Sequence, residues 1–323
     1  MTSLLSISPL CLTIVIALSL TCLDGTRAFA FAPTQQYTSF TRHNHKYTSF
    51  TQINASAEDE ISTSESSNGN MPVKTRTPKV SNRSKSVSSF KVMDILRRAN
   101  ELQQAGHSVI HCEVGQPESG APSTVAAAAV ESLSSRNVMG YTDAFGLLPL
   151  REKISQHYRK KYDLDDESVH VKKIVVTTGS SGGFLLAFTA CFDVGDTVAV
   201  ASSGYPCYRN ILGALDVNLT NVKINDEFKL TAKELKAEIM FRRENNLKEI
   251  NGLILSSPSN PTGAMLSPEE LKGLCELCDE EGIQFLSDEI YHGISYGKKE
   301  ASALTYSSNV IVLNSFSKYY SSK

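Results

Sequence analysis

The sequence predicts an α/β fold in which a mostly parallel sheet is covered by helices on both faces. From Val171 onward, short segments that are apolar throughout alternate with stretches of helical spacing. Strands that are apolar at every position are typical of a parallel sheet buried on both faces. The chain has 323 residues, of which 41% are hydrophobic and 20% charged, so it can bury a sizeable core. In such a fold, functional sites lie at the carboxyl ends of the strands.

The N-terminal 57 residues are predicted to be a targeting sequence in two parts. An apolar stretch, Leu10–Leu20, and small residues before Ala30 indicate a signal peptide over residues 1–30, although the first ten residues contain no Lys or Arg. A core strand or helix is the alternative for this stretch. Residues 31–57 are rich in Ser, Thr and Gln and contain no Asp or Glu, which is typical of an organelle transit peptide.

Together the two parts resemble the presequence of algae with secondary plastids, in which a Phe follows the signal cleavage site, as Phe31 does here. The resemblance implies a plastid location; the secretory pathway or another organelle is the alternative. Residues 58–86 are polar and Ser-rich, and they are predicted to form a disordered linker. We expect the folded domain to occupy residues 87–323.

The domain is expected to begin with helices. A helix from Phe90 ends at Gly106, a short strand covers residues 109–114, and two more helices lie between Pro122 and His157, separated by a glycine-containing loop. The strands of the sheet are then expected at residues 173–178, 197–202, 221–224, 252–257, 283–289 and 309–315, with helices opening near Ser181, Tyr205, Thr231 and Ser267.

Four of these strands end in polar motifs. Residues 178–183 (TGSSGG) open a helix and can bind an anion through backbone N–H groups, although an ordinary helix cap has the same appearance. Asn260 lies between two prolines, in a motif that turn chemistry alone could explain. Asp288 ends a buried strand and needs a cationic partner. Lys318 follows the last strand, as a surface residue or as a partly desolvated amine that can act as a nucleophile.

In this order the motifs SSPSNPTG, SDEIY and NSFSK resemble the class I and II aminotransferases, which are fold-type I pyridoxal-phosphate enzymes of the aspartate aminotransferase type. GYTDAFGLLPLREKI, TTGSSGG and GYPCY fit the same pattern, so the resemblance covers residues 90 to 321. It implies pyridoxal 5′-phosphate as cofactor and transamination between an amino acid and a 2-oxo acid, as a step in amino-acid metabolism.

The resemblance also implies a role for each matching residue. Lys318 would form the Schiff base with the cofactor and move the proton, Asp288 would pair with the pyridine nitrogen, and Tyr291 and Asn260 would bind the ring's phenolate oxygen. The remaining assignments are Ser180, Ser181, Ser315 and Ser317 to the phosphate, Tyr205 to stacking on the ring, Gly115 to the substrate carboxylate, and Tyr141 to the phosphate of a partner subunit in a homodimer.

The sequence departs from the family pattern at its end. The family continues beyond KYYS with MTGWR, whereas here Ser322 and Lys323 follow. We therefore expect a truncated chain that lacks the phosphate-binding arginine, the C-terminal part of the large domain and most of the small domain. The final strand would then have an open apolar edge.

Three functions follow as alternatives. The first is transamination; the second is other pyridoxal-phosphate chemistry on the same fold, such as a β-lyase or an aminocyclopropane-carboxylate synthase. The third is an inactive fragment that acts only as a binding or interaction protein. The net charge of −2 excludes a globally basic nucleic-acid-binding protein, and we expect no membrane partner after processing. Cys275 and Cys278 are expected in the core rather than at a metal, and His292 is expected to have a structural role.

Overall fold

The computed structural model describes residues 14–18, 79–85, 87–89, 91–115, 120–134 and 140–320. The chain divides into two units, residues 1–21 with 80–323 and residues 22–79, and every helix and strand described below lies in the first.

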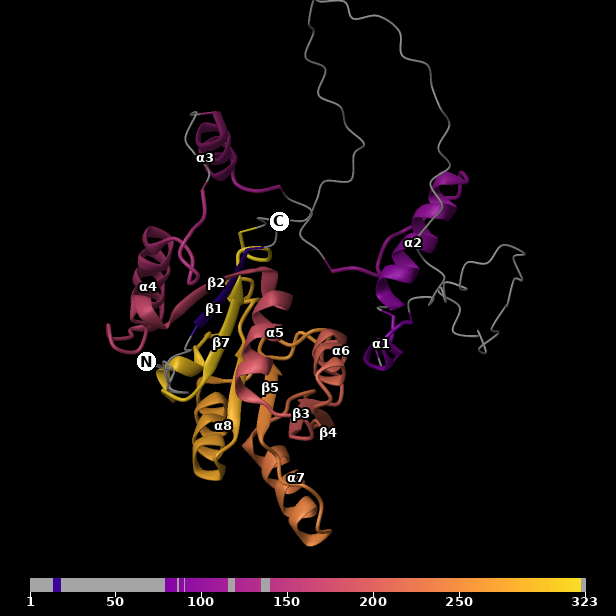
Figure 1. The fold of residues 1–323 in the computed structure, drawn as a ribbon, viewed down its shortest axis with the longest axis vertical. Coiled ribbons are helices and arrows are strands. Elements are labelled where there is room, and N and C mark those ends of the chain that lie inside the picture. Colours follow the sequence, from indigo (N-terminus) through magenta and orange to yellow (C-terminus); the bar gives the residue numbers. More distant parts are fainter. Residues whose placement is uncertain are drawn as a thin grey trace, which may run out of the picture. The chain divides into compact units, whose positions relative to one another are not determined.

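Seven strands form one sheet, and all of their pairings are parallel (Figure 1). In sheet order they run β2-β1-β7-β6-β5-β3-β4. Their bounds are β1 Ile14–Leu18, β2 Ile174–Thr178, β3 Thr197–Ala201, β4 Asn218–Val222, β5 Gly252–Ser256, β6 Gln284–Asp288 and β7 Ile311–Ser315. The mostly parallel sheet predicted from the apolar segments is confirmed.

Helices connect the strands, as parallel pairing requires. They are α1 Asn82–Lys85, α2 Lys91–Gln104, α3 Ser123–Ser134, α4 Leu148–Tyr162, α5 Gly179–Cys191, α6 Pro206–Ala214, α7 Ala232–Glu244 and α8 Pro268–Glu281, with short 3-10 helices η2 Val171–Lys173 and η3 Ala303–Thr305. Capping boxes fix the starts of two of them: Thr231 with Glu234 before α7, and Ser267 with Glu270 before α8.

The core lies in two layers, one on each face of the sheet. Alternate residues of a strand point to opposite faces, so Leu253 and Leu255 of β5 pack with α4, α7 and α8. Ile254, between them, packs with α5 and α6. The central strands β3 and β5 are therefore buried at every position, which explains why their sequences are largely apolar, whereas the edge strand β4 is partly exposed and polar.

Two sequence predictions about strands are wrong, and one helix lies where none was predicted. Residues 109–114 form no strand, because no strand of the described chain pairs with them. The strand expected at 221–224 lies at Asn218–Val222, where Thr220 and Val222 are buried. The short helix α1 lies within the region expected to be a linker.

The final strand also differs from expectation, because β7 has no open edge. It pairs with β6 on one side and on the other with β1, which in turn pairs with β2. β1 belongs to the apolar stretch of the predicted signal peptide. In the structure this stretch contributes a strand to the sheet, which was the alternative interpretation. The targeting role of residues 1–57 stays a prediction, and most of these residues lie outside the described chain.

Candidate active site

A cavity of about 370 Å³ lies at the carboxyl ends of the strands, where the α/β architecture places functional sites. Loops that follow β2, β3, β5, β6 and β7 contribute to its wall. Among the predicted site residues, Gly115, Ser180, Ser181, Tyr205, Asn260, Asp288, Tyr291, Ser317 and Lys318 line it. Residues spread over about 200 positions of the sequence thus meet in one site.

Asp288 is the buried acid of the cavity, with only 1% of its surface exposed. Its carboxylate accepts hydrogen bonds from the hydroxyl of Tyr208 and from the backbone N–H of Ile290. Burial raises the pKa of Asp288 to about 6, against the opposing effects of these hydrogen bonds and of the Lys318 charge. An ionised carboxylate here is stabilised by a further cation.

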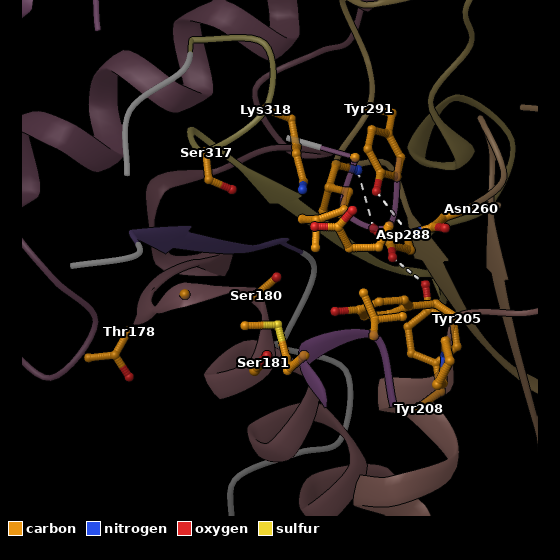
Figure 2. Close-up of a pocket in the computed structure, with 18 residues that line it drawn as sticks. Thr178, Ser180, Ser181, Tyr205, Tyr208, Asn260, Asp288, Tyr291, Ser317 and Lys318 are labelled. Carbon is orange, nitrogen blue, oxygen red and sulfur yellow. Dashed lines mark hydrogen bonds between the residues drawn. The ribbon is translucent and has the colours of Figure 1, made fainter. Parts of the chain in front are cut away.

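Lys318 and Tyr291 come from neighbouring strand ends, and Figure 2 shows both side chains extending into the cavity. The Lys318 Nζ lies 5.5 Å from the centre of the Tyr291 ring. Asn260 donates a hydrogen bond from Nδ2 to the Tyr291 hydroxyl over 3.1 Å. Because burial raises its pKa, the Tyr291 hydroxyl stays protonated at neutral pH and can donate to a ligand.

The opposite wall carries hydroxyl and backbone donors. Ser180 and Ser181 lie in the first turn of α5, where N–H groups have no partner within the helix (Figure 2). Ser317, the residue before Lys318, also lines the cavity. Ser315 does not line the cavity; its Oγ accepts a hydrogen bond from the Ser317 N–H over 3.1 Å and lies 2.7 Å from the Ser317 Oγ. Ser315 therefore supports Ser317 from behind.

The cavity is bordered by two of the three remaining predicted residues, Tyr205 and Gly115, but not by Tyr141. The Tyr205 ring borders it, and burial raises the pKa of this tyrosine to about 12. Gly115 borders it as well, and a methyl group added there would contact no described atom within 4 Å. Tyr141 lies outside the cavity and is fully exposed.

Sequence reasoning missed Tyr208, which is 2% exposed and donates to Asp288. The available signal was its position three residues after Tyr205, which places both rings on one side of α6. The rings are 5.5 Å apart in an edge-to-face arrangement. Val92, Met93, Glu113 and Val114, which belong to the N-terminal region, were also missed and line the cavity.

The residues present fit pyridoxal phosphate. The buried carboxylate of Asp288 matches a protonated pyridine nitrogen, which would supply the cation that it needs. The serine-rich first turn of α5 matches a phosphate group, and Lys318 provides a primary amine for an aldehyde.

The two cysteines of α8 are part of the core, as expected. Cys275 and Cys278 are each 1% exposed, and burial raises the pKa of Cys275 to about 12. Within the described residues no cluster of His, Cys, Asp and Glu could hold a metal ion. No helix in the same residues has the length and apolar character needed to cross a membrane.

The parallel α/β fold and a strand-end pocket with a lysine, a buried aspartate and a serine-rich helix start define the class of the protein: an enzyme fold with a site for a phosphorylated aromatic aldehyde. The model of the aminotransferase class I and II family matches residues 108–323. The chain belongs to this family, whose members depend on pyridoxal phosphate.

Known relatives agree with this assignment. A valine–pyruvate aminotransferase of Mycobacterium tuberculosis is 43% identical over 238 residues, which cover 72% of this chain and 58% of the relative. An aspartate aminotransferase of Geobacillus stearothermophilus is 32% identical over 222 residues, covering 68% of this chain and 53% of the relative. The crystal structure of an aminotransferase from M. tuberculosis superimposes with a TM-score of 0.68 at 41% identity, covering 76% of this chain and 61% of that structure. The chain thus spans between 53% and 61% of the length of these relatives.

Proposed function

We propose that the protein catalyses the pyridoxal-phosphate-dependent transfer of an amino group between an amino acid and a 2-oxo acid. The observation that carries the proposal is the pairing of Lys318 with the buried Asp288 in one cavity, beside the Asn260–Tyr291 hydrogen bond. These four side chains supply an amine, a counter-ion for a ring nitrogen, and two donors for a ring oxygen.

Pyridoxal phosphate, when bound, supplies an electron sink for the electrons of the substrate Cα–H bond. The Nζ of Lys318 would hold the cofactor covalently and, once released, would carry the proton away from the substrate Cα. Asp288 would keep the proton on the pyridine nitrogen. Asn260 and Tyr291 would donate hydrogen bonds to the ring's phenolate oxygen.

The other cavity residues would bind and orient. Ser180 and Ser181, at the start of α5, would hold the phosphate together with Ser317, which Ser315 positions. Tyr205 would lie against the ring, and the backbone at Gly115 would face the substrate carboxylate.

The relative of 43% identity named valine–pyruvate aminotransferase suggests the first substrates to test. We propose valine as amino donor and pyruvate as acceptor, a pair that requires the site to admit an aliphatic side chain.

Borohydride reduction of the protein with pyridoxal phosphate tests the assignment of Lys318. A pyridoxyl group on the Lys318 peptide, found by mass spectrometry, is expected together with alanine formation from valine and pyruvate. Lys299→Ala, at an exposed lysine, is the matched control and should keep the label. Label on other lysines only would overturn the assignment. A label on Lys318 with elimination of the substrate instead of amino transfer would favour the other pyridoxal-phosphate chemistries.

We also propose a homodimer in which the exposed Tyr141 reaches the phosphate of the partner subunit. Mixing Lys318→Ala subunits with Tyr141→Phe subunits tests this, because a shared site predicts that one intact site returns in the mixed dimer. Activity that does not exceed that of the Tyr141→Phe protein alone would contradict it.

Finally, we propose that residues 1–57 direct the protein to a plastid. The apolar stretch, the small residues before Ala30 and the acid-poor segment after it support this. A fluorescent protein fused to residues 1–57 should enter the plastid of a secondary-plastid alga, and Phe31→Ala should leave it outside. Secretion of the unaltered fusion would favour the alternative location.

A further inference from the structure

A second, buried cluster lies behind the site, on the other side of the turn that follows β6. In the segment Asp288–His292, Asp288 and Tyr291 line the cavity. Glu289 and His292 are 1% and 7% exposed and do not line it. The backbone N–H of His292 donates to the carbonyl of Glu289 over 3.0 Å, so the two residues are the ends of one tight turn.

The His292 ring bridges two segments that are distant in sequence. Its Nε2 lies 3.0 Å from the backbone carbonyl of Ser257, which can only accept, so Nε2 carries the proton and donates. In the neutral imidazole its Nδ1 is then an acceptor, and the hydroxyl of Tyr162 lies 2.7 Å from it. Burial raises the pKa of Tyr162, which keeps this hydroxyl protonated and able to donate.

Glu289 lies against the same ring. Its Oε1 accepts from the Ser287 hydroxyl, the Ser302 hydroxyl and the Ala303 N–H over 2.9–3.1 Å. Its Oε2 lies 3.5 Å from the His292 Nδ1 and accepts no hydrogen bond from a described residue. Three donors on one oxygen fix the carboxylate, and the carboxylate limits the rotation of the ring.

Ser257 begins the loop that carries Asn260. The Ser257 N–H donates to the Asp288 carbonyl over 3.2 Å. Two side chains of the turn therefore contact the loop. In the cavity, the Tyr291 hydroxyl accepts from Asn260. Behind the cavity, His292 donates to the backbone carbonyl of Ser257. The contact between His292 and Ser257 and the contact between Tyr291 and Asn260 thus connect the same turn to the same loop.

We propose that His292 is a positioning residue for the site, whose imidazole joins the Asn260 loop to the Tyr291 turn and is itself oriented by Tyr162 and Glu289. The inference rests on the proposed function where it concerns the cofactor, because Asn260 and Tyr291 are the groups proposed to bind its phenolate oxygen. The contact between loop and turn exists independently of the cofactor.

Two variants separate positioning from simple packing. Glutamine places its amide nitrogen near the position of Nε2 and can still donate to the Ser257 carbonyl, whereas the shorter asparagine reaches only to the position of Nδ1. His292→Asn should therefore break the bridge and His292→Gln should restore most of it. Cys278→Ala, at a buried residue of α8, is the control for a loss of stability outside the cluster.

Hydrogen exchange of the cofactor-free protein gives the first measurement. His292→Asn should speed amide exchange across residues 257–264 by about 10-fold, the effect of one lost hydrogen bond, while His292→Gln and Cys278→Ala should leave that loop unchanged. Equal exchange of the loop in both His292 variants would overturn the proposal.

The bound cofactor gives the second measurement. The pH midpoint of its absorption should rise in His292→Asn, because two misplaced donors stabilise the phenolate less, and it should return toward the wild-type value in His292→Gln. An unchanged midpoint, together with a lowered melting temperature in both variants, would mean that His292 contributes only to packing, and it would overturn the proposal. If the wild-type protein bound no pyridoxal phosphate at Lys318, the proposed function would fail, while the exchange experiment would still decide the role of His292.

Discussion

The helices at residues 82–134 and the helices from α4 onward have similar sequence patterns but differ in how many of their residues are buried. α2 and α3 contain no buried residue, and Met93 and Ile95 of α2 are each about half exposed. α8, also of 14 residues, buries five. An amphipathic pattern therefore predicts a helix from local spacing, whereas burial depends on which element lies opposite. Of these three helices, α8 is the one whose residues pack in the described core of the sheet.

The site draws on both regions but unequally. The strand-end loops supply the lysine, the aspartate, the amide and the hydroxyls, whereas the N-terminal region adds Val92, Met93 and residues 113–115 to the wall. Substitutions in the strand-end loops and in α8 should therefore change chemistry or stability strongly, and substitutions in α2 should change them little.

The largest effect is expected at Lys318. Lys318→Ala should lower the rate of amino transfer by about 10⁴-fold or more, because the amine both attaches the cofactor and carries the proton. Steady-state kinetics with valine and pyruvate measures the loss, and circular dichroism checks that the fold persists. A loss of less than 10-fold would remove Lys318 from the chemistry.

A core substitution in α8 should come next. Leu274 is 0% exposed, so Leu274→Ala should lower the free energy of unfolding by about 2–5 kcal/mol through lost burial and a cavity. Urea denaturation measures it. A change below about 1 kcal/mol would mean that the contrast with α2 does not hold.

The buried carboxylate predicts an effect that depends on pH. In the folded, cofactor-free protein the pKa of Asp288 is raised from 3.8 to about 6, so the folded state binds more protons than the unfolded state between these values. The contribution of Asp288 to stability should therefore fall as pH rises from about 4 to 6 and remain low above. Asp288→Asn removes this loss and should be up to about 3 kcal/mol more stable than wild type at pH 8, with little difference at pH 4.

Thermal unfolding of the two cofactor-free proteins at both pH values tests this. Glu227→Gln, at an exposed carboxylate paired with Lys229, is the matched control and should show no comparable gain at pH 8. If Asp288→Asn gave the same difference from wild type at both pH values, the raised pKa would be wrong.

The smallest effect is expected in α2. Met93 is 51% exposed, so Met93→Ala should change the free energy of unfolding by no more than about 0.5 kcal/mol. Its place in the cavity wall predicts a change in the KM for the amino acid and little change in kcat. A loss of stability as large as that of Leu274→Ala would show that α2 packs as firmly as α8.

The sequence predicts the sheet region better than the N-terminal region. Central strands such as β3 and β5 were predictable because burial on both faces makes their residues largely apolar. The motifs that follow the strands indicated Asp288 and Lys318, and both line the cavity. Residues 109–114 are as apolar as an edge strand but lack a partner, which no local pattern reveals. Tyr208 meets Asp288 across 80 positions, and such a contact is fixed by the packing of α6 rather than by spacing in the sequence.

The position of β1 has one further consequence. β2 leads directly into the serine-rich start of α5, and β7 ends three residues before Lys318. The two strands do not pair with each other in the described sheet; each pairs with β1. One intervening strand holds their ends about 10 Å apart, so β1 acts as a spacer between the start of α5 and the segment that contains Lys318. Cleavage after Ala30 would remove Ile14–Leu18, and the mature protein would keep this spacing only with another strand in the same position.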